Sequence, residues 1–497
     1  MNDKAKPRGT ILCLVNSAAY SRSYFVELAP HLKSCGYDVR FALDSHLSDV
    51  VYADGEAIPD AWYFTDFLKQ SYKYLPTDDE LARHTWSSLL PDFDRFLTLE
   101  IPPPLGTNVK LKYRHIPALL ARFFDNIFEA VRPAAILYEP VSNAFAIAAY
   151  RAALASGIPF CSLSPSRIPG RIELSMSGAL GDDVTIGSIF GRAHAGAVSN
   201  ESRALAADYI STIDTQVPDY MKINGLDQTS LTSKYLKPAK LAHFARGLRY
   251  RRHYRDDCAI AFQHGDPLAL SVAFVKRAVL RRLRLNTVHR YYQRTLSDEP
   301  FLLYPLHFHP EASTSVLAGD FMDELSTIKA IAFRLPSNIT LYVKEHPSAV
   351  ALQPISFYRQ LDAMPNVRLL APELATKNVI RRSRGVITLT STVGFEAAVL
   401  NKPVVTLGNI FYNYFPNVRS VRDYSGFSDA IRWALEYTPI STSDILEATA
   451  AYVEFGAPGS FDFFASLGKP QAFASVTKLI VRELDRRSQQ SYHAPSP

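Results

Sequence analysis

The chain has 497 residues, which is too long for one ordinary core and predicts two domains of roughly 200 residues each. Apolar residues make up 47% of the chain, as in a globular protein with an ample core. Four scattered cysteines without a CxxC pair argue against a disulfide framework or a thiolate zinc site and favour a reducing cytosol. We find no run of the roughly 20 apolar residues that would span a bilayer, and no signal-peptide pattern near Met1.

Alternating apolar strands and amphipathic helices begin the first half. This alternation is interrupted by residues 45–115, which contain many aromatic side chains and several helical stretches. This order predicts a parallel sheet with helices packed on it. The expected strands are 11–15, 37–43, 134–138 and 159–163, and the expected helices are 24–35 and 143–156.

Residues 200–297 are predicted to be mostly helical, and a second alternation follows. We therefore expect a GT-B-like α/β architecture of two facing Rossmann-like domains, with ligands at the carboxyl ends of the strands. The expected strands are 301–305, 340–344, 367–370 and 386–389, and the expected helices are 320–334, 355–363, 427–437 and 469–487. The expected divisions are an acceptor domain at 1–233, a basic helical segment at 234–297, a donor domain at 298–468, and a helix with a disordered tail at 469–497.

A small polar turn, Thr390-Ser391-Thr392-Val393-Gly394, connects a strand to a helix. The backbone N–H groups at a helix start suit a phosphate, and Glu396 in the first helical turn has the position to reach a ribose. The simpler interpretation is that the hydroxyl groups only cap the helix. We favour the phosphate and ribose site.

Two other polar clusters follow strands of the second half. Lys344 and His346 alternate along an extended segment, so their side chains share a face that suits a phosphate, unless Lys344 simply pairs with Glu345. His307 and Glu311 follow the first strand, and we expect them to contact donor sugar or phosphate, with Glu311 a candidate catalytic group. No third ligand at a suitable spacing supports a metal site.

The first half offers candidates for the acceptor side. Glu139 directly follows a strand and is the leading candidate base for an acceptor hydroxyl, although it also has the position of a helix cap. Arg167 and Arg171 lie in a loop and are candidates to clamp an anionic substrate, or are simply solvated.

The net charge of +6 is concentrated in one segment. Residues 234–294 contain 15 Lys and Arg against three Asp. A helix with an apolar stripe and flanking cations is typical of an anionic membrane surface, whereas the alternative is a solvated helix that packs its stripe on the domain. We find no motif for nucleic acid and expect none as a partner.

Three blocks of the second half resemble the capsule polysaccharide biosynthesis family, which includes bacterial Kdo transferases with a GT-B fold: YPLHFHPEAS (304–313), LYVKEHP (341–347) and TSTVGFEAAVLNKPVVTLG (390–408). Blocks EPVSN (139–143) and SRIPGR (166–171) look similar to related surface-polysaccharide proteins. The resemblance implies that His346 and Pro347 contact the donor nucleotide and phosphate, Ser391 and Thr392 the phosphate, and Glu396 the ribose. It implies a glycosyltransferase without metal or other cofactor.

We therefore expect a cytoplasmic protein, peripheral at the inner face of the membrane, that transfers a sugar from a CMP-Kdo-like or UDP-sugar donor. The acceptor is a capsule or other surface glycan, or a lipid-linked one. Two alternatives stay open: a nucleotide-sugar 2-epimerase, and a non-catalytic subunit of polysaccharide assembly or export.

Overall fold

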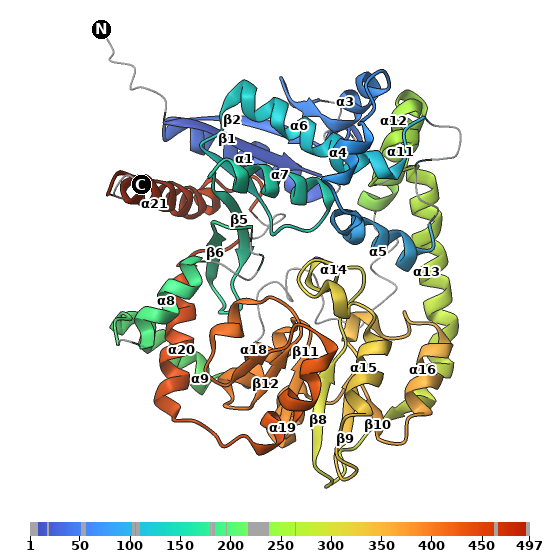
Figure 1. Cartoon of the computed structure of the whole chain (residues 1–497), viewed down its shortest axis with the longest axis vertical. Coiled ribbons are helices and arrows are strands. Elements are labelled where there is room, and N and C mark those ends of the chain that lie inside the picture. The colour runs from blue at the N-terminus through green and yellow to red at the C-terminus, as the bar shows by residue number, and fades with distance from the viewer. Residues whose placement is uncertain are drawn as a thin grey trace.

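The chain folds around two seven-stranded sheets, one in each half of the molecule (Figure 1). The computed structural model describes residues 8–16, 19–50, 56–101, 105, 110–178, 180, 184–194, 196–216, 238–263, 265–461 and 466–493. The expected two-domain α/β architecture is confirmed, since both sheets are built mainly of parallel strands with helices between them.

The first sheet has the order β14-β6-β5-β4-β1-β2-β3 and is parallel except at one edge. There β6 pairs antiparallel with both β5 and β14, so the stretch expected to be a loop after residue 163 is the connection of a hairpin. The strands are β1 (Gly9–Val15), β2 (Tyr37–Leu43), β3 (Trp62–Tyr63), β4 (Ala135–Tyr138), β5 (Phe160–Pro165), β6 (Arg171–Ser175) and β14 (Ala457–Pro458).

The second sheet has the order β13-β12-β11-β8-β9-β10-β7, and every neighbouring pair is parallel. Its central strands are fully buried because helices cover both faces. The strands are β7 (Tyr292–Gln293), β8 (Phe301–Pro305), β9 (Thr340–Lys344), β10 (Val367–Leu370), β11 (Gly385–Thr388), β12 (Val404–Thr406) and β13 (Val418–Ser420).

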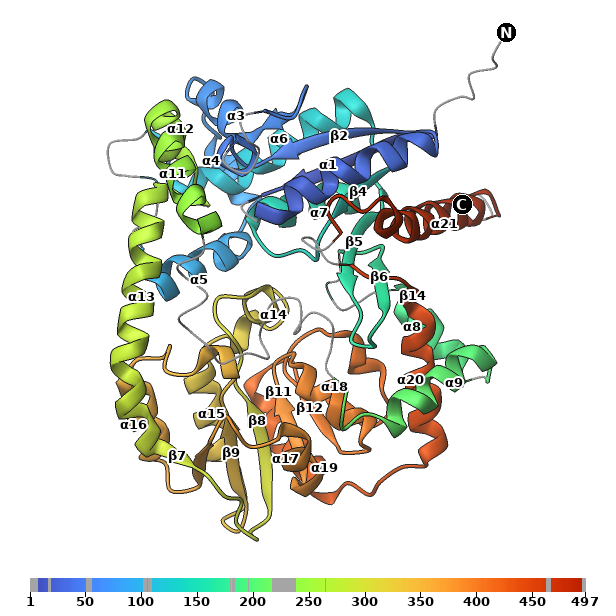
Figure 2. The same ribbon diagram turned by 180° about the vertical axis from the view of Figure 1, so that it is seen from behind.

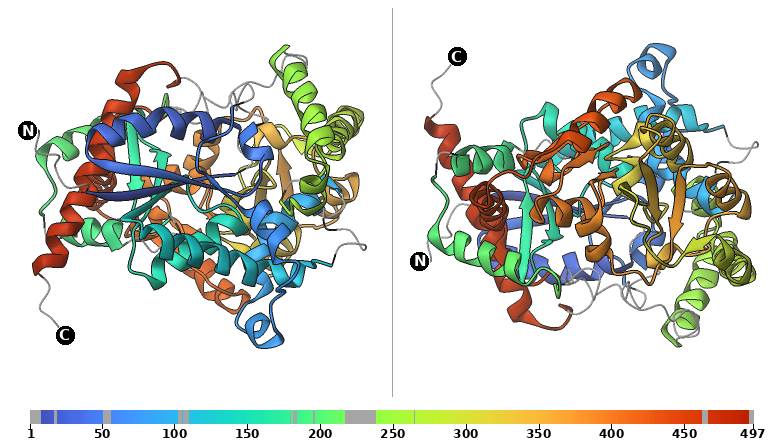
Figure 3. Two further views of the ribbon diagram at one scale, coloured as in Figure 1. Left: turned by 90° about the horizontal axis from the view of Figure 1, so that it is seen from above. Right: turned by 90° about the horizontal axis from the view of Figure 1, so that it is seen from below.

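Helices lie on both faces of the first sheet, with α1 on one face and α6 and α7 on the other, as the view from above in Figure 3 shows. The helices of this half are α1 (Ala19–Ser34), α2 (Leu47–Val50), α3 (Phe64–Ser71), α4 (Asp78–Ala82), α5 (Leu90–Leu99), α6 (Ile116–Val131) and α7 (Ala144–Ala155). Those that accompany the second sheet are α14 (Ala312–Ser315), α15 (Glu324–Ala332), α16 (Ile355–Asp362), α17 (Thr376–Arg382), α18 (Thr392–Val399), α19 (Phe427–Glu436) and α20 (Thr442–Phe455).

The two hydrophobic cores divide the chain differently from the expected boundary at residue 233. Helices α8 (Val184–His194) and α9 (Asn200–Ser211) pack with α20 in the core of the second half. In return β14 and α21 (Pro470–His493) join the core of the first half (Figures 1 and 2). The chain therefore crosses between the halves again near its C-terminal end, and α21 contains all of the expected tail except residues 494–497, which lie outside the described residues.

The basic segment is helical, as expected, over most of its described residues, and near its end it contributes strand β7 to the second sheet. Helices α11 (Pro238–His253) and α12 (Arg255–Ile260) lie beside the first half, and α13 (Pro267–Val288) runs along the outside of the molecule from the first half to the second (Figures 1 and 2). Residues 234–237 lie outside the described residues. No helix in the described part of the chain combines the length and the apolar character needed to cross a bilayer.

Candidate active site

The loops at the carboxyl ends of the strands meet between the two halves. Helix α14, which follows β8, lies between the sheets in Figure 1. The imidazole of His309, in the same loop, has Nδ1 4.0 Å from Oδ2 of Asp94 on α5 of the first half. The strand ends on which the sequence places its candidate residues therefore face one another across the molecule.

Glu324 is a functional candidate that the sequence analysis missed. It begins α15, and its buried carboxylate accepts hydrogen bonds from the backbone N–H of His307 at 3.1 Å and from Tyr304 Oη at 3.3 Å. The rings of His307 and His309 lie 3.2 and 3.0 Å from its two oxygens. Burial would raise the pKa of Glu324, but the two histidines outweigh burial and lower it to about 2. The fold places Glu324 beside the two histidines, and sequence spacing alone does not indicate this contact.

The two histidines make different contacts. Burial lowers the pKa of His309, but the carboxylates of Asp94 and Glu324 overcome it and raise the pKa to about 10, so the ring is an imidazolium at neutral pH. His307 Nε2 accepts the backbone N–H of Thr390 at 3.2 Å. This contact assigns the ring proton of a neutral His307 to Nδ1, which donates to Glu324.

Lys344 ends β9 with its ammonium turned to backbone oxygens. Nζ donates to the carbonyl of Pro372 at 2.9 Å, and burial lowers its pKa to about 8. Glu345 points to the other face, where Tyr358 Oη donates to it at 2.6 Å and Tyr292 Oη also donates. The alternative that Lys344 pairs with Glu345 is therefore wrong, as the alternation of a strand requires.

His346 presents one ring nitrogen to the space beyond β9. Its Nδ1 accepts the backbone N–H of Ser348 at 3.2 Å, capping a short 3₁₀ turn that begins at Pro347. Burial, with the neighbouring His307 and Lys344, lowers the pKa of His346 to about 4. The ring is neutral at pH 7, with its proton on Nε2, and no hydrogen bond joins this nitrogen to the described residues. It is therefore available to donate to a ligand.

The turn after β11 is tied down by its own hydrogen bonds. Thr390 Oγ1 donates to the carbonyl of Ser313 at 2.7 Å. Ser391 is the N-cap of α18, because its Oγ accepts the backbone N–H of Val393 at 3.2 Å. The capping interpretation is thus correct for Ser391, while the half-buried side chains of Ser391 and Thr392 remain accessible. A cap and a phosphate site are compatible at a helix start.

Gly394 has a structural reason to be glycine. A Cβ at this position would lie 2.6 Å from the hydroxyl of Tyr412 and 2.9 Å from Cγ2 of Thr388. The same hydroxyl donates to the carbonyl of Ser391 at 2.8 Å. The missing side chain thus lets Tyr412 lie against the turn and support it, and the Gly394 N–H is itself donated to the Ser391 carbonyl at 2.9 Å.

Glu396 pairs with a lysine instead of facing open space. Its Oε1 lies 3.7 Å from Nζ of Lys377, which also donates to the carbonyl of Gln216 at 2.6 Å. Burial raises the pKa of Glu396 to about 7, although Lys377 opposes the shift. A ribose role would require the carboxylate to share its position with this lysine.

Glu139 lies at the carboxyl end of β4, where it was expected. It is not the helix cap, because Asn143 caps α7 by accepting the backbone N–H of Ala146 at 3.0 Å. Ser142 Oγ lies 3.4 Å from Glu139 Oε1. Burial raises the pKa of Glu139 to about 7, against hydrogen bonds with Tyr138 and Ser142. A carboxyl group with such a pKa suits general base catalysis at neutral pH.

The two arginines of the first half have different surroundings. Arg171 donates to the carbonyls of Val453 at 2.9 Å and Gly456 at 2.5 Å, so its guanidinium holds the end of α20. The backbone N–H of Arg167 donates to Tyr452 Oη at 2.9 Å, and its side chain is half-buried. Arg167 therefore remains a candidate for an anionic substrate, and Arg171 has a structural role.

Glu311 brings the second half close to Arg167. Its side chain is solvent-accessible and accepts a hydrogen bond from Ser313 Oγ at 3.0 Å. Desolvation raises its pKa, and Ser313, the two histidines His307 and His309, and Arg167 counteract this shift. The loops after β5 and β8 are thus near enough for their charges to interact across the cleft.

The structure therefore brings together part of the predicted site. His307 contacts Thr390, acts electrostatically on His346 and Glu311, and is held by Glu324. Gly394, Glu396 and Arg171 are each engaged in the contacts described above. No described contact joins Glu139 to the second half.

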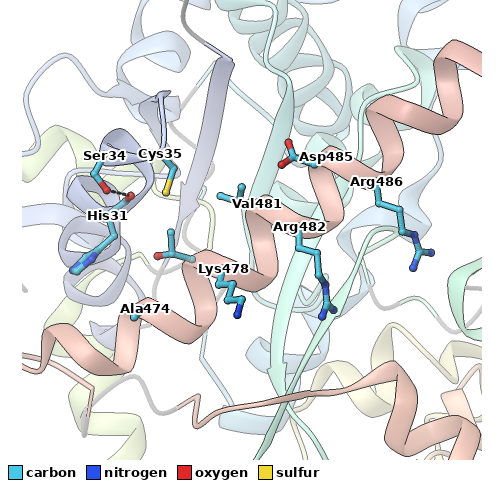
Figure 4. A pocket seen from close by; sticks show the side chains of 10 residues that line it. His31, Ser34, Cys35, Ala474, Lys478, Val481, Arg482, Asp485 and Arg486 are labelled. Carbon is cyan, nitrogen blue, oxygen red and sulfur yellow. Dashed lines mark hydrogen bonds between the residues drawn. The ribbon is translucent and has the colours of Figure 1, made fainter. Parts of the chain in front are cut away.

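A cavity of about 510 Å³ lies beside His307, His309 and Glu324, between α5, α13 and α16. A larger hollow of about 780 Å³ lies between α1 and α21, where Figure 4 shows Lys478, Arg482 and Arg486 along α21. The hollow adjoins the C-terminal end of α1, directly before β2 begins. It therefore lies at the amino-terminal ends of the strands, whereas the candidate site lies at their carboxyl ends. No group of three or more His, Cys, Asp or Glu among the described residues is placed to hold a metal ion.

Comparison with known proteins supports the family resemblance. Residues 231–415 match the model of the capsule polysaccharide biosynthesis protein family, which confirms the resemblance over the second half. No curated protein matches the chain. The matched region contains the residues at the ends of β8, β9 and β11, and it does not include Glu139 or Arg167.

Solved structures with a similar arrangement are distant. KpsC, a beta Kdo 2,4 transferase from Thermosulfurimonas dismutans, is 13% identical with a TM-score of 0.33, over 64% of this chain and 79% of that chain. The UDP-GlcNAc 2-epimerase from Neisseria meningitidis bound to UDP-GlcNAc is 11% identical with a TM-score of 0.27, over 96% of this chain and 100% of that chain. At these values the likenesses carry no argument about activity.

Proposed function

We propose that the protein is a glycosyltransferase that moves a sugar from a nucleotide-activated donor, CMP-Kdo-like or a UDP-sugar, to a capsule or other surface glycan or a lipid-linked acceptor. The observation that carries the proposal is the neutral His346, whose Nε2–H has no hydrogen bond to the described residues, next to His307 and within the region that matches the capsule polysaccharide family.

The donor binds in the second half. His346 Nε2 donates a hydrogen bond to its phosphate, and the accessible hydroxyl groups of Ser391 and Thr392 lie at the positive end of the α18 dipole. These groups stabilise the negative charge that develops on the leaving nucleotide, without a metal or other cofactor. His307 positions the turn through its contact with Thr390.

The acceptor binds against the first half. Glu139, as its carboxylate, takes the proton of the acceptor hydroxyl while the acceptor oxygen bonds to the anomeric carbon. The bond from that carbon to the donor phosphate breaks, and the nucleotide leaves with the electron pair. Arg167 and Glu311 line the opening between the halves. We place this reaction in the cytoplasm, at the inner face of the membrane.

A thermal-shift screen of the full chain with CMP, UDP, GDP and dTDP tests the donor site. A nucleotide at about 100 times its Kd should stabilise the fold by about 2.7 kcal/mol, which is seen as a higher Tm. His346→Ala should abolish the shift. The exposed His253 of α11, changed to Ala, is the matched control and should retain it.

Two results would overturn the proposal. If no nucleotide raises the Tm of the wild type, the chain is not a nucleotide-sugar enzyme, as expected of a non-catalytic assembly subunit. If the protein converts a donor into a new nucleotide sugar without acceptor, it is a 2-epimerase.

A further inference from the structure

Helix α13 exposes an apolar stripe on its outer side. Val272, Val275, Val279 and Leu283 are between 54% and 69% exposed, and their spacing places them on one face of the helix. On α11, Phe244 and Leu248 are also exposed and lie one helical turn apart. Phe274 of α13 is also exposed, at 44%, but its spacing places it away from this stripe, and the other exposed large hydrophobic side chains of the described residues occur singly on different elements.

The opposite side of α13 is occupied by the protein. Arg277 donates to the carbonyl of His309, Arg281 to that of Val350, and Arg284 to that of Leu352, at 2.8, 2.8 and 2.9 Å. The helix is thus held with these three arginines inward and its apolar stripe outward. The alternative that the stripe packs on the domain is wrong, because the groups that pack inward are these cations with Leu270 and Ala273.

The two helices that expose these apolar residues are also rich in cations. Helices α11 and α13 carry ten Lys and Arg and no acidic residue. Arg249, Arg252 and Arg282 are exposed, and no ion pair joins them to another described residue. An apolar strip on helices with exposed cations matches a surface that is anionic outside and apolar beneath.

We propose that this face of α11 and α13 docks on an anionic lipid bilayer, with Val272, Val275, Val279 and Leu283 in the acyl boundary and the arginines at the lipid headgroups. Over the eleven helical steps from Val272 to Leu283 the stripe extends about 16 Å, the length of an interfacial contact and not of a span.

Helix α13 also borders the cavity beside the candidate site. The helix packs on α5 of the first half and meets α16 of the second, and it lines one side of the 510 Å³ cavity beside His307. A bilayer bound to its outer face would lie one helix diameter from that cavity, about 10 Å. This deepens the location proposed above and names the surface that makes the contact.

Vesicle sedimentation of the full chain, without nucleotide, tests the proposal. The wild type should bind vesicles that contain phosphatidylglycerol, bind vesicles of phosphatidylcholine alone more weakly, and lose binding as salt increases. Val275→Asp/Leu283→Asp should lower the bound fraction on the order of tenfold, because it removes apolar contacts and adds repulsion. The double substitution Arg249→Glu/Arg282→Glu should lower the fraction bound to the vesicles and make binding less sensitive to salt.

The matched control is Leu154→Asp/Phe333→Asp, which changes equally exposed apolar residues on α7 and at the end of α15 and should bind as the wild type does. All variants should melt as the wild type does, since the side chains are exposed. The proposal is overturned if the wild type ignores anionic vesicles, if the α13 variant still binds them, or if light scattering shows a dimer that only this variant loses. These outcomes are independent of nucleotide binding, so they leave the transferase proposal standing.

Discussion

Glu324 shows how one buried carboxylate organises the loop after β8. It remains ionised because the histidines His307 and His309 donate to it, and His309 remains protonated because Asp94 faces it from the other half. The cation between two carboxylates therefore joins the halves of the molecule. The strength of this bridge between the halves depends on the pH, because it forms between the imidazolium of His309 and the carboxylates of Glu324 and Asp94.

Changing His309 to Gln tests this charge bridge. The pKa of His309 is raised to about 10 in the folded chain, above the value of about 6.5 for an unfolded histidine, so its contribution is complete below pH 6.5 and disappears as the pH rises through 10. We expect His309→Gln to lower the free energy of unfolding by about 3–5 kcal/mol near pH 6, because it leaves Glu324 without its cation. Urea titrations between pH 6 and 10 measure this.

In the variant, the free energy of unfolding should vary less between pH 6.5 and 10 than in the wild type. His253→Gln, at an exposed histidine of α11, serves as the control and should follow the wild type. Parallel pH profiles for wild type and His309→Gln would contradict the role assigned to His309.

At the scale of elements, the start of α18 combines two functions in one turn. Ser391 caps the helix, and Tyr412 holds the turn from outside against Gly394. The cap orients the N-terminal end of α18 to the space between the halves, where we propose that the donor phosphate lies. Because Ser391 has a structural role in any case, its removal alone does not reveal a ligand.

Ser391→Asp separates the two functions. Aspartate is as good an N-cap as serine, so the stability should change by less than about 0.5 kcal/mol, whereas Ser391→Ala should cost about 1 kcal/mol. The added carboxylate should repel the donor phosphate and remove the nucleotide-induced rise in Tm. Ser441, the N-cap of α20, offers the control, since Ser441→Asp should retain that rise. A normal nucleotide response in Ser391→Asp would exclude this turn as the phosphate site.

At the scale of the whole molecule, the halves are joined by elements that cross between them. Arg171 on β6 binds the carbonyls at the end of α20, whose body packs in the second core. Helix α13 joins the halves at another side of the molecule (Figure 1). Arg167 lies only four residues before Arg171, but its charge acts on Glu311 of the second half.

The two arginines should therefore respond differently to substitution. Arg171→Ala should lower the free energy of unfolding by about 1–3 kcal/mol, because carbonyls lose their donor, and leave transfer by the folded enzyme near wild type. Arg167→Ala should change stability little and lower kcat/KM at least about tenfold if it contacts substrate. Chemical denaturation and transfer assays at saturating donor distinguish these outcomes. The reverse pattern would contradict the assignment.

The sequence by itself determined the local structure and carried the family resemblance. Apolar runs such as 301–305, 340–344 and 367–370 coincide with β8, β9 and β10, because a buried parallel strand needs a continuous apolar segment. The small polar turn at Ser391 and the polar cluster around His346 were recognised because each directly follows an apolar run. Short motifs there also carried the resemblance that the family match confirms.

Only the tertiary structure decided which side chains meet. Glu324 contacts His307 from another element, Glu396 pairs with Lys377, and Arg171 binds the end of α20. The partners in each contact are separated along the chain, so sequence spacing does not indicate that they meet. Likewise, α8 and α9 belong to the second core and the apolar stripe of α13 faces outward, because packing in three dimensions and not periodicity selects which face of a helix is buried.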